Sequence, residues 1–171
     1  MSNMNVILCG MMGCGKSTVG VILAKKINCE WVDTDALIEE RYGGIAELFE
    51  RCGEEYFRGL ETEILKELIT KEGLVLSMGG GILLREENRK LLQRMGKMVY
   101  LRADVNTLAS RLEADVKRPL LQSGKFLKER LKSLMETRSS IYEGAADIVV
   151  DVDGKTPEEI SDEIIKDIGQ V

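Results

Sequence analysis

The chain of 171 residues contains no histidine. A Ser-His-Asp triad, a Cys-His pair and a histidine general base are therefore excluded, and any chemistry must use carboxylates, lysine, arginine, backbone groups or a metal ion. The four cysteines form no C-x-x-C pair, and a mixed Cys/His zinc site is excluded with the histidine. The first residues lack the basic segment of a secretion signal, so we expect reduced thiols in a cytosolic protein.

Long apolar runs and prolines are also scarce. No apolar stretch approaches the roughly 18–20 residues needed to cross a bilayer, and only two prolines occur. The 24 basic and 29 acidic residues give a formal net charge of −5, which disfavours non-specific binding to nucleic acid or to a membrane surface. With 44% hydrophobic and 31% charged residues, the composition predicts one folded domain rather than a disordered chain.

Short apolar runs alternate with longer segments of helical periodicity. The predicted strands are residues 6–9, 30–33, 74–77, 98–101 and 148–151. The last helical segment begins at a capping box, Thr156-Pro157-Glu158-Glu159. The alternation predicts an α/β fold, a parallel sheet flanked by helices on both faces. Ligands of such sheets bind beyond the carboxyl ends of the strands, so the residues after each strand are the candidates for function.

The first predicted strand runs into Gly10-Met11-Met12-Gly13-Cys14-Gly15-Lys16-Ser17-Thr18, followed directly by a helical segment. Residues and context both match the phosphate loop G-x-x-x-x-G-K-[ST]. Its glycines let backbone N–H groups point inward as an anion nest at the start of a helix. Lys16 would reach the β- and γ-phosphates, and the Ser17 hydroxyl would ligate Mg²⁺. This context favours a nucleoside triphosphate site over an ordinary glycine-rich turn.

The class of phosphate-loop protein follows from motifs that the chain lacks. A GTPase would carry an N-K-x-D motif that reads guanine, and none is present. An ABC-type ATPase needs a longer chain and a signature loop. The length of 171 residues suits a small-molecule kinase.

The second predicted strand ends in Asp33-Thr34-Asp35. Two carboxylates at i and i+2 on an extended segment face the same way, here toward the phosphate loop. One could orient Mg²⁺ through water, and the other could accept the proton of a substrate hydroxyl. The alternative is that one aspartate caps a helix beginning near Ala36, and the sequence does not separate the two. Asp151, after the last strand, is interpreted as a solvated strand end.

Two arginines fall on the apolar faces of separate predicted helices. Arg58 lies seven residues before Leu65, and Arg138 lies seven residues after Leu131. Either arginine alone would suggest an ordinary salt bridge. Together, beside a phosphate loop, they predict a fixed anion, for which a carboxylate offers planar bidentate pairing. The third strand runs into Gly79-Gly80-Gly81, which either lets a ligand approach the backbone closely or forms a flexible turn.

A further candidate segment is Arg118-Pro119-Leu120-Leu121-Gln122-Ser123-Gly124-Lys125, between two helical segments. A loop of this composition suits a lid that closes over phosphates. A kinase needs such closure because an open site hydrolyses its ATP. A plain helix–helix connector is the alternative.

This ordered set of motifs resembles the shikimate kinase family over essentially the whole chain. The phosphate loop is shared with many kinases, whereas the combination of the other segments is specific. Those segments are Asp33-Thr34-Asp35, Gly53-Glu54 with Phe57-Arg58-x-x-Glu61, Gly79-Gly80-Gly81, Arg118-Pro119-Leu120-Leu121, and Arg138 with Tyr142. The resemblance implies a P-loop kinase with a five-stranded parallel sheet, of the nucleoside-monophosphate-kinase type. It implies one kinase domain over residues 1–171, with a substrate-binding helical region at about 33–61 and a lid at about 113–125.

That family uses MgATP to phosphorylate the 3-hydroxyl of shikimate, on the route to chorismate and the aromatic amino acids. The resemblance implies that Lys16 and the loop amides hold phosphate and that Ser17 and Asp33 serve Mg²⁺. Asp35 is implied to engage the attacking hydroxyl as the candidate base. Arg58 and Arg138 are implied to bind the shikimate carboxylate, with Glu61 orienting Arg58 and Gly80 supplying a backbone contact. Arg111 is implied to lie against adenine. Arg118 is implied to stabilise charge on the transferring phosphate.

One departure from the family pattern lies just before the last helix. Where many members carry an arginine near the adenine, this chain has Lys155, which keeps the charge and loses planar stacking. We expect a cytoplasmic monomer that acts on shikimate and binds neither nucleic acid nor membrane. The alternatives are another small-molecule kinase, such as a gluconate or nucleoside-monophosphate kinase, and a non-catalytic nucleotide-binding regulator. A regulator could lose Asp35 or Arg118 without penalty, and both are present.

Overall fold

The computed structural model describes residues 4–114 and 125–169. The strands in this part of the chain are β1 (Asn5–Cys9), β2 (Glu30–Asp33), β3 (Leu74–Ser77), β4 (Gly96–Arg102) and β5 (Ile148–Asp151). The helices are α1 (Lys16–Ile27), α2 (Thr34–Tyr42), α3 (Ile45–Leu68), α4 (Glu86–Met95), α5 (Val105–Glu113), α6 (Lys125–Ala145) and α7 (Pro157–Ile168), with a short 3-10 helix, η1 (Ile82–Leu84). All five predicted strands are present, and β1 and β4 extend beyond their predicted bounds.

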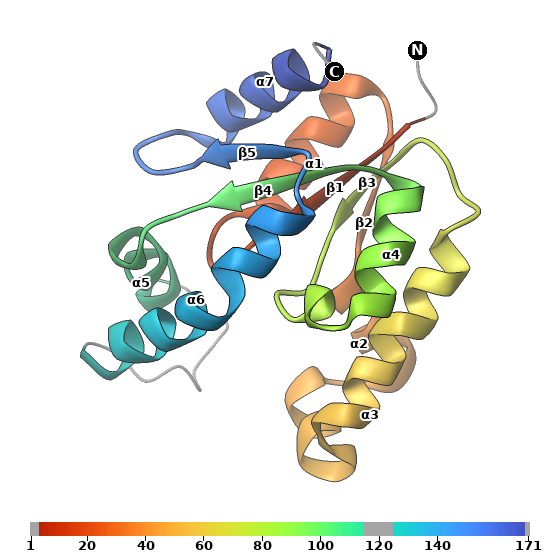
Figure 1. Cartoon of the computed structure of the whole chain (residues 1–171), viewed down its shortest axis with the longest axis vertical. Helices are drawn as coiled ribbons and strands as arrows, with labels where there is room; N and C mark the ends of the chain where they lie inside the picture. Colours follow the sequence, from red (N-terminus) through yellow and green to blue (C-terminus); the bar gives the residue numbers. More distant parts are fainter. Residues whose placement is uncertain (1–3, 115–124, 170–171) are drawn as a thin grey trace.

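The five strands form one sheet in the order β2-β3-β1-β4-β5, and every neighbouring pair is parallel. Helices α1 and α7 pack together on one face, while α4 and α6 lie across the other (Figure 1). This confirms the predicted α/β architecture. Because each strand returns through a helical crossover, all the carboxyl ends meet at one edge of the sheet.

Burial along the strands follows their place in the sheet. The central strands β1 and β3 are buried at every position, as expected for strands covered on both faces. The edge strand β5 alternates instead, and Val149 on its outer side is 40% exposed. The helices on the two faces therefore bury the centre of the sheet completely and leave part of its β5 edge exposed.

A buried asparagine joins the starts of three strands. The Asn5 side-chain amide donates to the carbonyls of Lys71 and Met95, at 2.8 and 3.0 Å, and its oxygen accepts the Leu74 N–H at 2.9 Å. Leaving such buried groups without partners would cost about 1–3 kcal/mol each. These bonds hold β1 in place against β3 and β4, and so set the register that carries through to the opposite edge.

Helix α3 changes direction at Gly53, where φ is +81°. After this bend its apolar stripe faces the core, with Phe57, Leu60, Ile64, Leu65 and Leu68 all buried. The stripe confirms the helical pattern predicted for this segment. The bend points the first half of α3 away from the sheet, beyond the carboxyl edge of the strands (Figure 1), and α2 packs against α3.

The start of the last helix lies where the sequence predicts it. Thr156 caps α7 in a reciprocal capping box with Glu159, with Pro157 as the first helical residue, as predicted.

Among the described helices, none combines the length and apolar character needed to span a bilayer. The predicted lid at 113–125 falls largely on residues outside the described ranges.

Candidate active site

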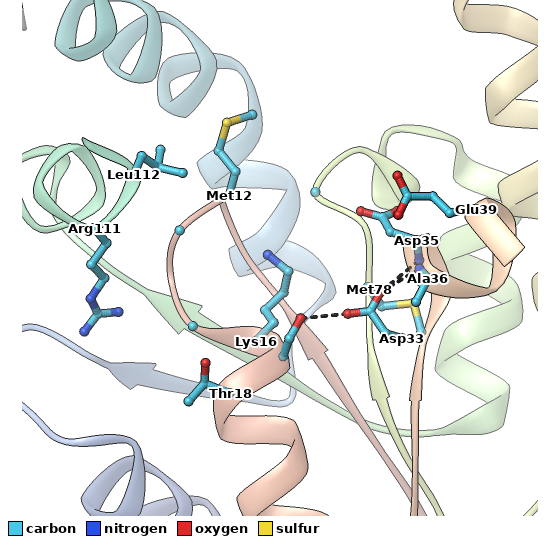
Figure 2. Close-up of a pocket in the computed structure, with 14 residues that line it drawn as sticks. Met12, Lys16, Thr18, Asp33, Asp35, Ala36, Glu39, Met78, Arg111 and Leu112 are labelled. Carbon is cyan, nitrogen blue, oxygen red and sulfur yellow. Dashed lines mark hydrogen bonds between the residues drawn. The ribbon is translucent and has the colours of Figure 1, made fainter. Parts of the chain in front are cut away.

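A cleft of about 550 Å³ opens at the carboxyl edge of the sheet. Figure 2 shows the phosphate loop with Lys16 on one side of it, and Asp33 and Asp35 at the start of α2 on the other. The rest of the lining comes from α5 and from the segment after β3, and includes Met78, Gly80, Arg111 and Leu112. The cleft thus joins segments that follow β1, β2 and β3, as the location rule for parallel sheets predicts.

The phosphate loop depends on glycines with left-handed backbone. Gly10, Gly13 and Gly15 have φ values of +142°, +81° and +101°. At Gly10 a Cβ atom would also lie only 2.7 Å from the carbonyl oxygen of Leu101. Gly15 is the N-cap of α1 and offers no side-chain cap, and the first turn holds no acidic residue. The N–H groups and positive dipole end of α1 are therefore open to an anion.

Lys16 folds over its own loop. Its Nζ donates to the carbonyl oxygens of Gly10 and Met11, both at 2.9 Å, and lies 3.7 Å from the Cys14 sulfur. The ammonium is thus held directly above the anion nest. Cys14 itself is fully buried and is not among the residues that line the cleft. Gly13, Gly15, Ser17 and Thr18 line the cleft.

Ser77 holds the phosphate loop through Lys16, a role that the sequence patterns did not predict. Its hydroxyl donates to the Lys16 carbonyl oxygen at 2.9 Å and accepts from Trp31 Nε1 at 3.0 Å. A Cβ atom on Gly20 would lie 2.6 Å from both Ser77 Oγ and Trp31 Nε1, so α1 approaches the sheet closely here. The available signal was a serine at the end of an otherwise apolar strand.

Asp33 caps a helix, which is one of the alternatives left open by the sequence, and it also faces the phosphate loop. Its Oδ1 accepts the N–H groups of Asp35 and Ala36, at 3.0 and 3.1 Å, and so caps α2. Its Oδ2 accepts from the Ser17 hydroxyl at 2.7 Å. One carboxylate therefore serves a helix and the phosphate-loop side of the cleft together.

The expected relation of Asp35 to Asp33 was wrong in its local geometry. Asp33 is extended, but α2 begins at Thr34, so Asp35 lies in the first turn of a helix rather than on the same extended segment. Both still line the cleft. Thr34, which is fully buried, accepts the Gly79 N–H at 3.0 Å and ties α2 to the segment after β3.

The donors near Ser17 suit magnesium better than a tightly chelated metal. Among the described residues there is no group of three or more His, Cys, Asp or Glu side chains that could hold a metal ion. The Ser17 hydroxyl and Asp33 Oδ2 are close enough, at 2.7 Å, to act on the same ion. Mg²⁺ commonly keeps several waters and binds one or two protein oxygens plus substrate phosphates, so this pair fits it.

Arg58 is buried and already paired. Its guanidinium donates to Glu61 Oε2 at 2.7 Å and to Glu54 Oε1 at 3.1 Å. Only 9% of the residue is exposed. Gly81 leaves room for this guanidinium, because a Cβ atom there would lie 2.3–2.5 Å from it and would force the Arg58 side chain to shift. The predicted inward orientation is confirmed, and the glycine segment is what makes room for it.

Arg138 reaches the neighbouring glycine from the opposite side. Its Nη1 donates to the Gly80 carbonyl oxygen at 3.4 Å, and Tyr142 on the same helix donates to that oxygen as well. The two arginines therefore approach adjacent residues, Gly80 and Gly81. In the described part of the chain no carboxylate forms an ion pair with Arg138.

Glu61 is a buried carboxyl group whose pKa is raised. Burial raises its pKa from 4.5 to about 7, more than the attraction of Arg58 lowers it, and the charge of Asp35 raises it further. Its Oε1 has no hydrogen-bond partner among the described residues. That oxygen and Asp35 Oδ1 both crowd Gly79, where a Cβ atom would lie 3.1 and 2.4 Å from them.

The remaining predicted residues divide between the cleft and other places. Arg111 lines the cleft and donates to the Cys14 carbonyl oxygen at 3.0 Å. Lys155 is not among the lining residues, and its ammonium pairs with Glu163 of α7 at 2.5 Å. Asp151 is exposed and bonded to Arg102, as a solvated strand end should be. Arg118 lies outside the described residues.

Comparisons with known proteins agree on one family. The model of the shikimate kinase family matches residues 12–169. A shikimate kinase from Thermodesulfovibrio yellowstonii is 42% identical over 164 residues, 95% of this chain and 94% of the relative. One from Sulfurihydrogenibium sp. is 44% identical over 165 residues, 96% of this chain and 97% of the relative.

Solved structures point the same way. Shikimate kinase from Acinetobacter baumannii in complex with shikimate superposes with a TM-score of 0.91 at 34% sequence identity. The match covers 98% of this chain and 93% of the other. With a phosphate loop, two inward arginines and a triple glycine meeting at one edge of a five-stranded parallel sheet, the chain belongs to the shikimate kinase family.

Proposed function

We propose that this protein transfers the γ-phosphate of ATP to the 3-hydroxyl of shikimate, in the cytoplasmic route to chorismate and the aromatic amino acids. One observation carries the proposal. The phosphate loop and the two inward arginines converge on the same edge of the sheet, with Gly80 between Gly10 on the loop side and Arg138 on the other. A triphosphate and a carboxylate-bearing acceptor would therefore lie side by side.

The nucleotide side is built from backbone and one lysine. The amides of residues 13–18 and the start of α1 would receive the phosphates, because the first N–H groups of a helix have no partner within it and stand at its positive dipole end. Lys16 would exchange its bonds to the loop carbonyls for phosphate oxygens. We place adenine beside Arg111, which forms one end of the cleft. Lys155 is a weaker candidate for that role, because Glu163 already holds its ammonium.

Mg²⁺ would be held by Ser17 and Asp33, together with the phosphates. When bound, such an ion neutralises charge on the phosphate oxygens. Asp33 is well prepared for this role, since the two N–H groups at its Oδ1 fix the orientation of the carboxylate.

The acceptor side would hold shikimate by its carboxylate. Arg138 is the stronger anchor, because no carboxylate in the described part of the chain compensates its charge. Arg58 is partly neutralised by Glu61 and Glu54 but is fixed rigidly by them. Rigid guanidinium groups suit planar bidentate recognition of a carboxylate.

Asp35 would accept the proton of the attacking hydroxyl. It lies in the cleft opposite the phosphate loop, which is where an acceptor hydroxyl must stand for in-line transfer. Phosphoryl transfer asks for positioning and electrostatics rather than covalent catalysis, so a site without histidine is sufficient. We assign Arg118 to the transferring phosphate and residues 113–125 to a lid, within one kinase domain that acts as a monomer.

The direct test compares acceptors. ADP release would be followed in a coupled assay with shikimate, gluconate and AMP, each with MgATP. We expect stimulation by shikimate alone. No stimulation by shikimate would remove the proposal, and stimulation by gluconate or AMP would favour one of the rival kinases. Absence of turnover with all three, despite ATP binding, would favour a nucleotide-binding regulator.

Arg58→Ala should chiefly weaken shikimate binding, by the roughly 2–5 kcal/mol typical of losing one partner of a buried charge pair. Shikimate affinity would be measured by calorimetry, with the melting temperature recorded because the change also leaves Glu61 without its partner. Arg51→Ala, an exposed arginine of the same helix, is the matched control. An unchanged shikimate affinity would contradict the role of Arg58.

Asp35→Asn should suppress kcat by at least about 100-fold, the scale of a lost general base, while ATP binding stays nearly intact. The carboxamide keeps the shape of the side chain but cannot take the proton. Glu40→Gln, an exposed change on the same helix, should leave kcat unaltered. Near-normal turnover of Asp35→Asn would exclude Asp35 as an essential base.

The raised pKa of Glu61 makes fold stability depend on pH. Below pH 4.5 both folded and unfolded chains hold the proton. Between pH 4.5 and about 7 the unfolded chain loses it while the folded chain retains it, so the free energy of unfolding falls as pH rises. The full effect is up to about 3 kcal/mol, from 1.36 kcal/mol per pKa unit.

Glu61→Gln should therefore remove this component of the pH dependence. Urea unfolding at pH 5 and pH 8 would show a larger loss of stability for the natural chain than for the variant. Glu63→Gln, an exposed glutamate of α3, should behave like the natural chain. Equal losses for all three proteins would show that the Glu61 carboxyl does not keep its proton on folding.

A further inference from the structure

Two side chains of α6 reach one carbonyl oxygen. Arg138 and Tyr142 are four residues apart and so share a face of the helix. Tyr142 Oη donates to the Gly80 oxygen at 2.5 Å, whereas Arg138 Nη1 donates to it at 3.4 Å. The longer bond is the weaker one, since N–H···O bonds are normally 2.7–3.2 Å. The arginine is therefore the easier of the two donors to remove.

Tyr142 is firmly held as a donor. It is fully buried, and its ring packs against that of Tyr100 with centroids 5.2 Å apart. Burial raises the pKa of Tyr142, so its hydroxyl keeps its proton at neutral pH. The same hydroxyl lies 3.9 Å from the sulfur of Met11 in the phosphate loop. Tyr142 thus sits between the loop and the glycine segment, and of its two acceptors the Gly80 oxygen, at 2.5 Å, is much closer than the Met11 sulfur.

The two donors have different consequences for substrate binding. A carbonyl oxygen can accept two hydrogen bonds. If Arg138 turns to the carboxylate of a substrate, the Gly80 oxygen still has its bond from Tyr142. Without the tyrosine hydroxyl, the same movement would leave this part-buried oxygen without a protein donor, and the arginine would be retained on the carbonyl.

We propose that Tyr142 is a positioning residue of the acceptor site, whose hydroxyl holds the Gly80 carbonyl and so frees Arg138 for the carboxylate of the acceptor. This inference rests on the proposed shikimate kinase activity and adds to it a residue that touches neither substrate. Tyr142 acts through Arg138, and this dependence separates it from a residue that merely supports the fold.

The test is a double-mutant cycle on Tyr142→Phe and Arg138→Ala, read as kcat/KM for shikimate. Tyr142→Phe removes one oxygen and keeps the ring against Tyr100. We expect it to lower kcat/KM for shikimate about tenfold, the scale of one unsatisfied buried group, with KM for ATP changed less than about twofold. In the Arg138→Ala background the same change should lower kcat/KM less than about twofold, because no arginine remains to be freed.

Tyr100→Phe is the matched control, because it removes another buried tyrosine hydroxyl, one that faces Ser139 instead of Gly80. It should leave both KM values unaltered. Melting temperatures of all variants are recorded, and kinetics are measured at a temperature below the lowest of these melting temperatures. An unchanged shikimate kcat/KM in Tyr142→Phe overturns the inference, as does an equal loss with and without Arg138. A natural chain that shows no shikimate-dependent ADP release refutes the proposed function itself.

Discussion

The hydrogen-bonded register of β1 against β3 is the constraint on which the site depends. Leu8 pairs with Ser77, and the Met78 N–H continues the ladder to the Leu8 oxygen at 3.0 Å. Beyond this point one strand turns into the phosphate loop and the other into the triple glycine. A slip of one residue would turn every side chain to the opposite face. The buried bonds of Asn5 at the far end of the sheet protect this register.

The two inward arginines are chemically unlike each other despite their similar place in the sequence pattern. Arg58 is rigid and partly neutralised, held between two glutamates and the backbone of Gly81. Arg138 has no carboxylate partner in the described residues; it makes a long bond to the Gly80 carbonyl and interacts with the Tyr142 hydroxyl. A fixed cation next to an adjustable one lets the site stay ordered when empty and still close on an anion, because the cost of reorganisation falls on one side chain.

Local patterns predicted the sheet, the phosphate loop and the inward arginines, because apolar periodicity and glycine spacing are properties of neighbouring residues. What the sequence could not show depends on partners distant in the chain. The two oxygens of Asp33 serve a helix and Ser17 separately, and Ser17 lies 16 positions earlier in the chain. Lys155 pairs with Glu163, eight residues further along the chain in α7. The bond from Ser77 to the phosphate loop spans 61 positions, beyond any periodicity.

The placement of Trp31 has a consequence for spectroscopy. It is the single tryptophan of the chain, and its indole is joined through Ser77 to the carbonyl of Lys16. All indole emission therefore originates two hydrogen bonds from the site where a triphosphate would be gripped. We therefore expect occupancy of the loop to change the emission of Trp31, so that binding could be followed without attaching a dye.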